Sequence, residues 1–129
     1  MTPQSEFLQL LVETAEKSCD LGCEISLLEL PKEGGIYAEL GQGVLVGQYY
    51  DRRAVRTWPV LFLCRNADQQ RCLDQLGAIC NYFQSLKKYP QGKQFQWLNT
   101  TIAKDVGRIG RDEDGTWHYS CVLNSEIYF

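Results

Sequence analysis

Cysteine and histidine are the side chains in this 129-residue sequence that most readily ligate a metal or attack a substrate, but their spacing suits neither role. A structural zinc site usually needs CxxC pairs, or cysteine and histidine at matched spacing. The closest two cysteines, Cys19 and Cys23, are separated by three residues, and His118 is the only histidine. His118 and Cys121 share an extended run, and their side chains are expected on opposite faces of a strand. We therefore expect no metal site and no Cys–His nucleophile.

The cysteines are instead expected to be reduced and to act as small apolar residues of the core. No secretory signal is recognisable at the start of the sequence, which argues against a disulfide framework. The six positions are Cys19, Cys23, Cys64, Cys72, Cys80 and Cys121.

Carboxylates, glycines and serines also lack the spacing of a catalytic or phosphate-binding motif. The tetrad Asp112–Gly115 resembles part of a calcium loop, but aligning its glycine with the loop glycine places Gly110 and Cys121 at ligand positions. The tetrad is therefore expected to form a hairpin turn. No glycine cluster matches GxxxxGK(S/T) or GxGxxG, and no serine lies in GxSxG. We expect a protein that is not an enzyme and has no cofactor, with a hydrolase as the most distant alternative.

Composition places the chain among ordinary globular proteins, with 44% hydrophobic and 22% charged residues. One domain is expected over residues 1–129. The net charge of −3 argues against a nucleic-acid backbone as the main partner. No apolar run approaches about 18 residues, so no membrane span is expected. Without a recognisable signal peptide, the protein is expected in the cytoplasm in which it is made.

Two amphipathic helices are expected from the spacing of apolar residues. The first begins at Pro3, with Thr2 as its N-cap, and ends near Cys19–Gly22. The second spans about twenty residues from Asn66, where Asn66 and Gln69 have the form of a capping box. The face of the second helix that is expected to meet water carries Gln70, Arg71, Asp74, Gln75, Asn81 and Gln84.

Runs of β-branched and aromatic residues between turn residues predict strands on both sides of the second helix. They are expected over Ile25–Leu30, Ile36–Leu40, Val44–Tyr50, Arg53–Cys64, Phe95–Leu98, Thr100–Val106, Arg108–Arg111 and Trp117–Phe129, with a loop over Lys32–Gly35. This order indicates an α+β domain whose mostly antiparallel sheet carries the two main helices on one face.

The stretch YYDRRAVRTWPVLFLC, residues Tyr49–Cys64, combines arginines and aromatics with an apolar run. Alternation along a strand leads us to expect an exposed first half and a second half buried on both faces. Pro59 cannot donate to a sheet ladder, so it indicates an edge or a bulge. The exposed half could be a solvated strand end, a protein–protein contact or, less favoured, a nucleic-acid contact. The residues predicted for a protein–protein interface are Arg52, Arg53, Arg56 and Trp58.

Three segments carry a resemblance to a known family: LPKEGGIYAEL, then YYDRRAVRTWPVLFLCRNADQQRCLDQLGAICNYFQSLKKYP, then FQWLNTTIAKDVGRIGRDEDGTWHYSCVLNSEIYF. Between Leu30 and Phe129 the chain resembles phage and prophage minor capsid proteins, the set that is similar to the tail terminators of long-tailed phages. The motifs are PVLFLCRN-x-DQQ, FQWL and DEDGTWHYSC…IYF, and none of them is catalytic.

The resemblance implies a small α+β fold like that of the lambda tail terminator, in a protein that forms a hexameric ring at the end of the tail tube. Such a ring stops tube polymerisation and joins the tail to the head and neck. The implied partners are further copies of the chain, the tail tube protein and a head–neck connector protein, with DNA only passing through the lumen. The implied location is the virion, after assembly in the bacterial cytoplasm. The alternatives are another head–tail connector or neck stopper, or a small protein- or DNA-binding adaptor.

Overall fold

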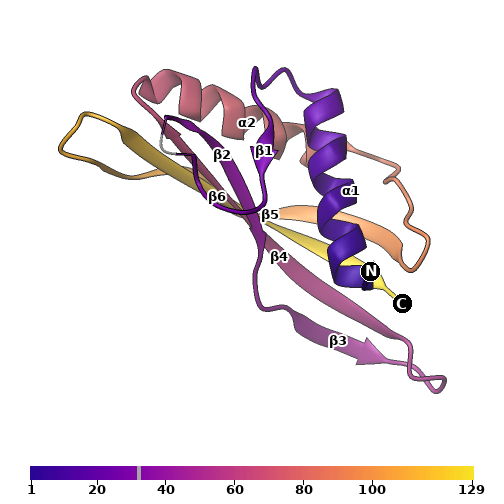
Figure 1. Ribbon diagram of the computed structural model, residues 1–129. Coiled ribbons are helices and arrows are strands. Elements are labelled where there is room, and N and C mark those ends of the chain that lie inside the picture. Colours follow the sequence, from indigo (N-terminus) through magenta and orange to yellow (C-terminus); the bar gives the residue numbers. More distant parts are fainter. Residues whose placement is uncertain (32) are drawn as a thin grey trace.

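The computed structural model describes residues 1–31 and 33–129, which form two helices and six strands (Figure 1). The elements in chain order are α1 (Pro3–Ser18), β1 (Ile25–Ser26), β2 (Gly35–Leu40), β3 (Val44–Gln48), β4 (Ala54–Asn66), α2 (Gln69–Ser85), β5 (Gln96–Arg111) and β6 (Trp117–Tyr128). The expected α+β class is therefore confirmed. Lys32, the first residue of the expected Lys32–Gly35 loop, lies outside the described residues.

The strands form one sheet in the order β1-β2-β4-β6-β5, and β3 also pairs with β4. Every pair is antiparallel except β1 with β2. The long strand β4 pairs with β6 from Val55 opposite Tyr128 to Asn66 opposite Trp117. Along its other edge, β3 pairs with the first part of β4 and β2 with the second part.

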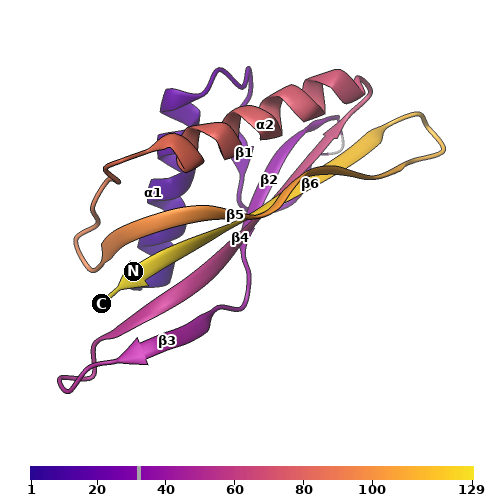
Figure 2. The same ribbon diagram turned by 180° about the vertical axis from the view of Figure 1, so that it is seen from behind.

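Both helices lie on the same side of the sheet, as Figures 1 and 2 show from opposite directions. The buried residues of β4 and β6 on that side alternate along each strand, and include Trp58, Val60, Phe62, Cys64, Tyr119, Cys121, Leu123 and Ile127. The ring of Phe7 in α1 lies 5.4 Å from that of Trp58 and 5.1 Å from that of Trp97. Phe83 of α2 stacks on Trp97 at 5.7 Å. A single hydrophobic core thus joins both helices to one face of the sheet.

A small polar network lies within this core. Thr100 Oγ1 accepts the indole N–H of Trp97 at 2.8 Å and lies 2.8 Å from Ser125 Oγ. Tyr89 Oη accepts the backbone N–H of Thr100 at 3.2 Å and donates to the Phe83 carbonyl at 3.0 Å. Because buried polar groups are costly when unpaired, these bonds fix how β5 sits between β6 and the chain that follows α2.

The helix starts show where local sequence signals succeed and fail. Thr2 Oγ1 caps α1 as expected, accepting a first-turn N–H at 3.2 Å. The capping box expected at Asn66 is wrong, because Asp68 is the N-cap of α2 and its Oδ1 accepts the Gln70 N–H at 3.0 Å. Asn66 still pairs within β4, and its side chain accepts the Asp68 N–H at 2.9 Å. The helix ends at Ser85, close to the end of the roughly twenty residues expected from Asn66.

The predicted strands had the wrong length in two regions of the chain. The strand expected over Ile25–Leu30 contains only Ile25–Ser26, since Ser26 Oγ accepts the backbone N–H groups of Leu28 and Glu29 at 3.3 and 3.4 Å. Those bonds turn the chain away from the sheet. The three short strands expected between residues 95 and 111 form one strand, β5, interrupted only by shifts of register. A β-bulge displaces the ladder locally without ending the strand, which explains the difference.

Pro59 lies inside the central strand, where proline is normally excluded. Its carbonyl accepts the N–H of Gly41 at 2.8 Å, so the polar groups of Pro59 face the edge of β4 that β2 and β3 share. Pairing with β2 ends at Val60, and pairing with β3 begins at Thr57. The missing N–H therefore falls in the gap between two partner strands, and the ladder with β6 loses no bond.

Candidate functional site

The most prominent surface feature is a hairpin made by β3 and the first part of β4, which projects from the body of the protein (Figures 1 and 2). We call residues 44–57 the arm. Every residue of β3 is exposed, including Val44 at 66%, Leu45 at 51% and Val46 at 63%. Tyr50 at the tip is fully exposed. Neighbouring apolar side chains that meet water together are typical of a surface that a partner covers.

The tip of the arm is a tight turn with an unusual residue in it. The Arg52 N–H donates to the Tyr49 carbonyl at 3.0 Å, and the Tyr49 N–H donates to the Arg53 carbonyl at 2.7 Å. This is a three-residue hairpin loop whose last position is left-handed. Arg52 occupies that position with φ of 71°, and it is the only non-glycine residue with positive φ in the described ranges.

The turn between β5 and β6 has the same bonding pattern with a different residue at the left-handed position. The Gly115 N–H donates to the Asp112 carbonyl at 3.0 Å, and the Asp112 N–H donates to the Thr116 carbonyl at 2.8 Å. Gly115 has φ of 88° and carries no Cβ to oppose that conformation. Arg52 bears the steric cost that Gly115 avoids, about 1–2 kcal/mol. A strained residue at an exposed tip points to a role outside the fold.

Two more of the predicted interface residues line the arm towards its base. Arg53 is exposed, with its guanidinium 5.8 Å from the centre of the Tyr128 ring. The Arg56 guanidinium lies 4.0 Å from the centre of the Phe129 ring, and Arg56 is partly buried. Its Nη1 atom is buried without a hydrogen-bond partner among the described residues. Arg52 and Arg53 are therefore open to a partner, whereas Arg56 mainly holds the base of the arm against Phe129, the residue that follows β6.

Trp58, the fourth predicted interface residue, is not on the surface. It is 5% exposed and packs against Phe7 at 5.4 Å and Phe129 at 5.5 Å. The alternation along β4 was correct, but α1 covers the face that carries Trp58. The expectation of a second half buried on both faces is also wrong, because Leu61 and Leu63 remain partly exposed on the face opposite the helices.

The free edge of β3 differs from the free edge of β5 on the opposite side of the sheet. β5 has four shifts of register along its pairing with β6, and it carries Lys104 and Arg108. Bulges and charges are the usual protection of an edge strand against pairing with another chain. The β3 sequence Val-Leu-Val-Gly-Gln has one register shift and no charge. The edge of β3 therefore has fewer of the bulges and none of the charges that protect the edge of β5 from pairing with another chain.

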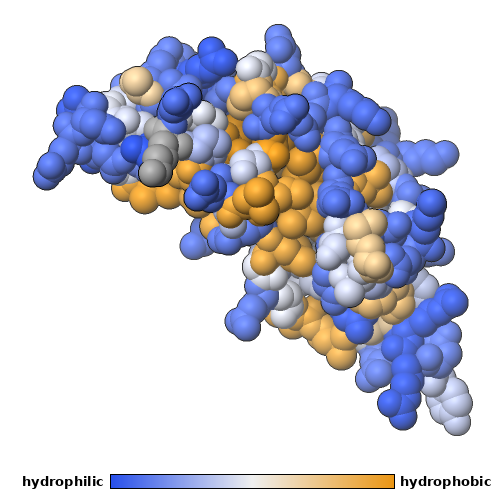
Figure 3. Space-filling model, viewed as in Figure 1, coloured by the Kyte–Doolittle hydropathy of each residue, from blue (hydrophilic) through white to orange (hydrophobic). Residues whose placement is uncertain are grey.

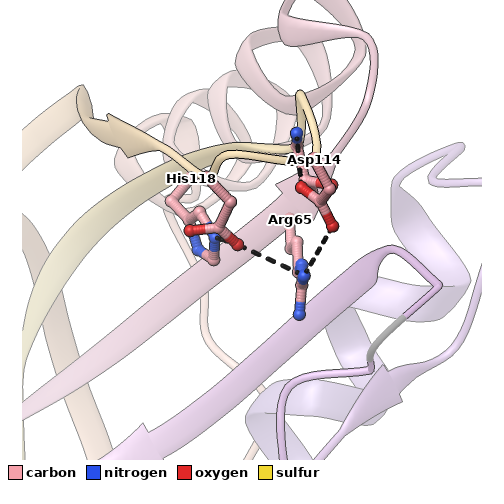
Figure 4. Close-up of polar contacts among 5 residues, drawn as sticks. Arg65, Asp114 and His118 are labelled. Atoms are coloured by element: carbon pink, nitrogen blue, oxygen red, sulfur yellow. Dashed lines mark hydrogen bonds and ion pairs between the residues drawn. The ribbon is translucent and has the colours of Figure 1, made fainter.

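A charged cluster ties the β5–β6 turn to the end of β4 (Figure 4). Arg65 Nη2 lies 3.2 Å from Asp112 Oδ2 and 3.5 Å from Asp114 Oδ2, and His118 Nε2 lies 2.8 Å from Asp112 Oδ2. Hydrogen bonds from the side chain and backbone of Thr116, with Arg65 nearby, lower the pKa of the Asp114 carboxyl. The expected hairpin turn is confirmed, and the cluster explains its carboxylates as braces of the turn. Sequence reasoning missed Arg65, which lies far from the turn in the chain.

The cysteines behave largely as expected. All six are free, and Cys64, Cys72, Cys80 and Cys121 are buried in the core. Burial raises the pKa of the Cys64 thiol. A hydrogen bond between Cys80 and Cys121, together with burial, raises the pKa of Cys121, and the same bond lowers that of Cys80. Since substrate cannot reach these thiols, none of the four is placed to act as a nucleophile.

Gln75 was expected on the solvent face of α2 and is instead buried, with 5% of its surface exposed. Its Nε2 donates to the Leu21 carbonyl at 2.6 Å, and its Oε1 accepts the Cys64 thiol at 3.3 Å. The side chain satisfies a carbonyl of the connection between α1 and β1. Its role is therefore to join that connection to the core.

Neither the geometry nor comparison with known proteins indicates a reaction. Within residues 1–31 and 33–129, no group of three or more His, Cys, Asp or Glu side chains is arranged to hold a metal ion. Neither helix of the same ranges is both long and apolar enough to cross a membrane. The chain matches no protein-family model and no curated protein. The arm is thus the feature that most needs a functional explanation.

Proposed function

We propose that this protein is a structural virion-assembly protein, a tail terminator that forms a ring at the end of a phage tail tube, stops tube polymerisation and joins the tail to the head and neck. The arm is the observation that carries the proposal. Three consecutive apolar residues of β3 and a tyrosine at the tip are exposed, on an edge strand without protecting charges. A ring subunit needs such surfaces, because each copy must contact two neighbours through different patches.

The structural roles of the charged and thiol side chains also support an architectural function. The charged cluster of Arg65, Asp112, Asp114 and His118 braces a turn, and the buried cysteines fill space between α2 and the sheet. These groups account for the side chains that could otherwise have suggested catalysis. The family-like segments noted in the sequence favour the same class of protein.

Nucleic-acid binding receives less support from the same arm. Its exposed arginines, Arg52 and Arg53, stand beside Asp51, whose Oδ2 lies 3.6 Å from Arg53 Nε. The protein as a whole carries a net charge of −3. A DNA-binding surface normally presents several unneutralised cations along the phosphate backbone.

The test is to inactivate the gene in the phage or prophage that encodes it and to measure tail length by electron microscopy. Tails without the protein are expected to have uncontrolled length and to remain unjoined to heads. A wild-type copy supplied in trans should restore both properties, and a copy lacking residues 44–50 should restore neither. Tails of normal length joined to heads in the absence of the protein would refute the proposal.

A further inference from the structure

The arm combines apolar surface with positive charge. Residues 44–57 contain three arginines and one aspartate, a net charge of +2. Arg52, Arg53 and Asp51 are all exposed at the tip, next to the fully exposed Tyr50. The surface that covers the arm should therefore offer apolar groups bordered by carboxylates.

The chain itself carries a surface of that kind around β1 and β2. Residues 22–40 contain four glutamates and one lysine, a net charge of −3. Leu28 is 92% exposed and lies between Glu24 and Glu29, both of which are exposed. The bonds from Leu28 and Glu29 N–H to Ser26 Oγ hold this turn outside the sheet. Figure 3 shows apolar side chains gathered over β1 and β2, with hydrophilic ones around them. We call residues 24–30 the acidic turn.

The arm and the acidic turn of one copy cannot reach each other. Ser26 pairs with Tyr37, which pairs with Leu63 near the end of β4. The arm turn precedes the opposite end of β4, next to Arg53. Ten residues of extended strand separate Arg53 from Leu63, which amounts to roughly 33 Å. Complementary surfaces at the two ends of one strand can meet only between different copies.

We propose that the arm of one copy docks on the acidic turn of the next, so that Arg52 and Arg53 face Glu24 and Glu29 and the apolar residues of β3 cover Leu28. This inference rests on the proposed ring-forming function and names the contact between neighbours. The contact is heterologous, joining two different patches, and repetition of such a contact closes a ring when the rotation between copies divides a full turn.

Charge reversal on each side of the contact tests the proposal, with sedimentation velocity across a concentration series as the measurement. The wild-type protein should associate as its concentration rises. The R52E/R53E variant and the E24K/E29K variant should each associate at least about tenfold more weakly, because each places like charges together. Mixing the two variants should restore association, since an intact arm then meets an intact acidic turn. The matched control K87E/K88E reverses two exposed charges after α2 and should associate as the wild type does.

Three outcomes would overturn the contact. Normal association of E24K/E29K would mean that the arm docks elsewhere, for example on the arm of another copy. Failure of the mixture to associate would exclude a heterologous contact between these two patches. If the wild type and both variants formed rings equally well, this contact would be excluded and the tail-terminator proposal would stand. Circular dichroism of each variant should match the wild type, because all four reversed side chains are exposed.

Discussion

Replacement of Arg52 by glycine should stabilise the tip of the arm. Arg52 holds φ of 71°, and the equivalent position of the β5–β6 turn is already glycine. Relief of the left-handed conformation is worth about 1–2 kcal/mol. The greater freedom of glycine in the open state offsets about 0.5–1 kcal/mol of this gain. The net gain, about 0.5–1 kcal/mol, lowers the equilibrium constant for opening of the turn by about twofold to fivefold.

Amide hydrogen exchange at Tyr49 measures this effect directly, because the Tyr49 N–H closes the turn by donating to Arg53. The exchange rate of this amide in R52G should fall by about twofold to fivefold. The reciprocal variant G115A should raise the exchange rate of Asp112, whose N–H closes the other turn. R53G removes the same charge as R52G at a residue without positive φ, and it should give no protection. Unchanged or faster exchange at Tyr49 in R52G would refute the assignment of strain to Arg52.

Three further predictions concern the core, the charged cluster and the cysteines. T100V should lower the free energy of unfolding by about 2–4 kcal/mol in urea titrations, because the buried Trp97 N–H and Ser125 hydroxyl each lose a partner. The control T101V, at the exposed neighbour, should change the free energy of unfolding by less than about 0.5 kcal/mol. D114N should lower stability at neutral pH but not in acid. Because the pKa of Asp114 is lowered in the folded protein, its carboxylate stabilises the fold above about pH 4, and this stabilisation disappears as the pH falls through the pKa of the folded state. An aromatic disulfide reagent should react with Cys19 and Cys23 in the folded protein and with the other four cysteines only in denaturant.

Each of these has a clear contrary result. Equal stability of T100V and T101V would mean that the hydrogen bonds of the Thr100 hydroxyl contribute nothing to the free energy of unfolding. A stability difference between D114N and the wild type that stays constant down to pH 2 would exclude the carboxylate as its source. Rapid reaction of more than two thiols under native conditions would show that the core around α2 opens easily.

The elements of this fold were largely predictable because their hydrophobic periods are clear. Cys121, Leu123 and Ile127 stand at alternate positions of β6 and are all buried, as the period of a strand with one covered face requires. The start of α2 was missed because Asn66 and Asp68 are both good caps and stand two residues apart. The choice between them is decided by β4, whose pairing with β6 continues as far as Asn66 opposite Trp117. This pairing is a contact between residues distant in sequence, so the local cap signals do not reveal it.

The candidate site was only partly predictable for the same reason. The basic and aromatic composition of the arm is local, so Arg52 and Arg53 could be singled out from the sequence. Whether Trp58 faces water depends on α1, which covers it in the fold although its residues lie 40 or more positions away in the sequence. Gln75 was expected on the solvent face of α2, and its bond to the Leu21 carbonyl explains why it is buried instead. Partners distant in sequence decided both cases.

The position of Pro59 separates the pairing of the arm from the pairing of β2 along one edge of β4. The ladder along one edge of β4 is interrupted there, so β3 can grow or shrink without disturbing the pairing of β2. Side chains alternate with a period of two, so insertions of two residues on each side of the tip, between Gln48 and Ala54, would keep every face as it is and leave the pairing of β4 with β6 intact. Each such insertion would extend the reach of the arm by about 7 Å. Under the proposed contact between neighbouring copies, a change in this one hairpin would alter the distance between the copies and leave the core unchanged.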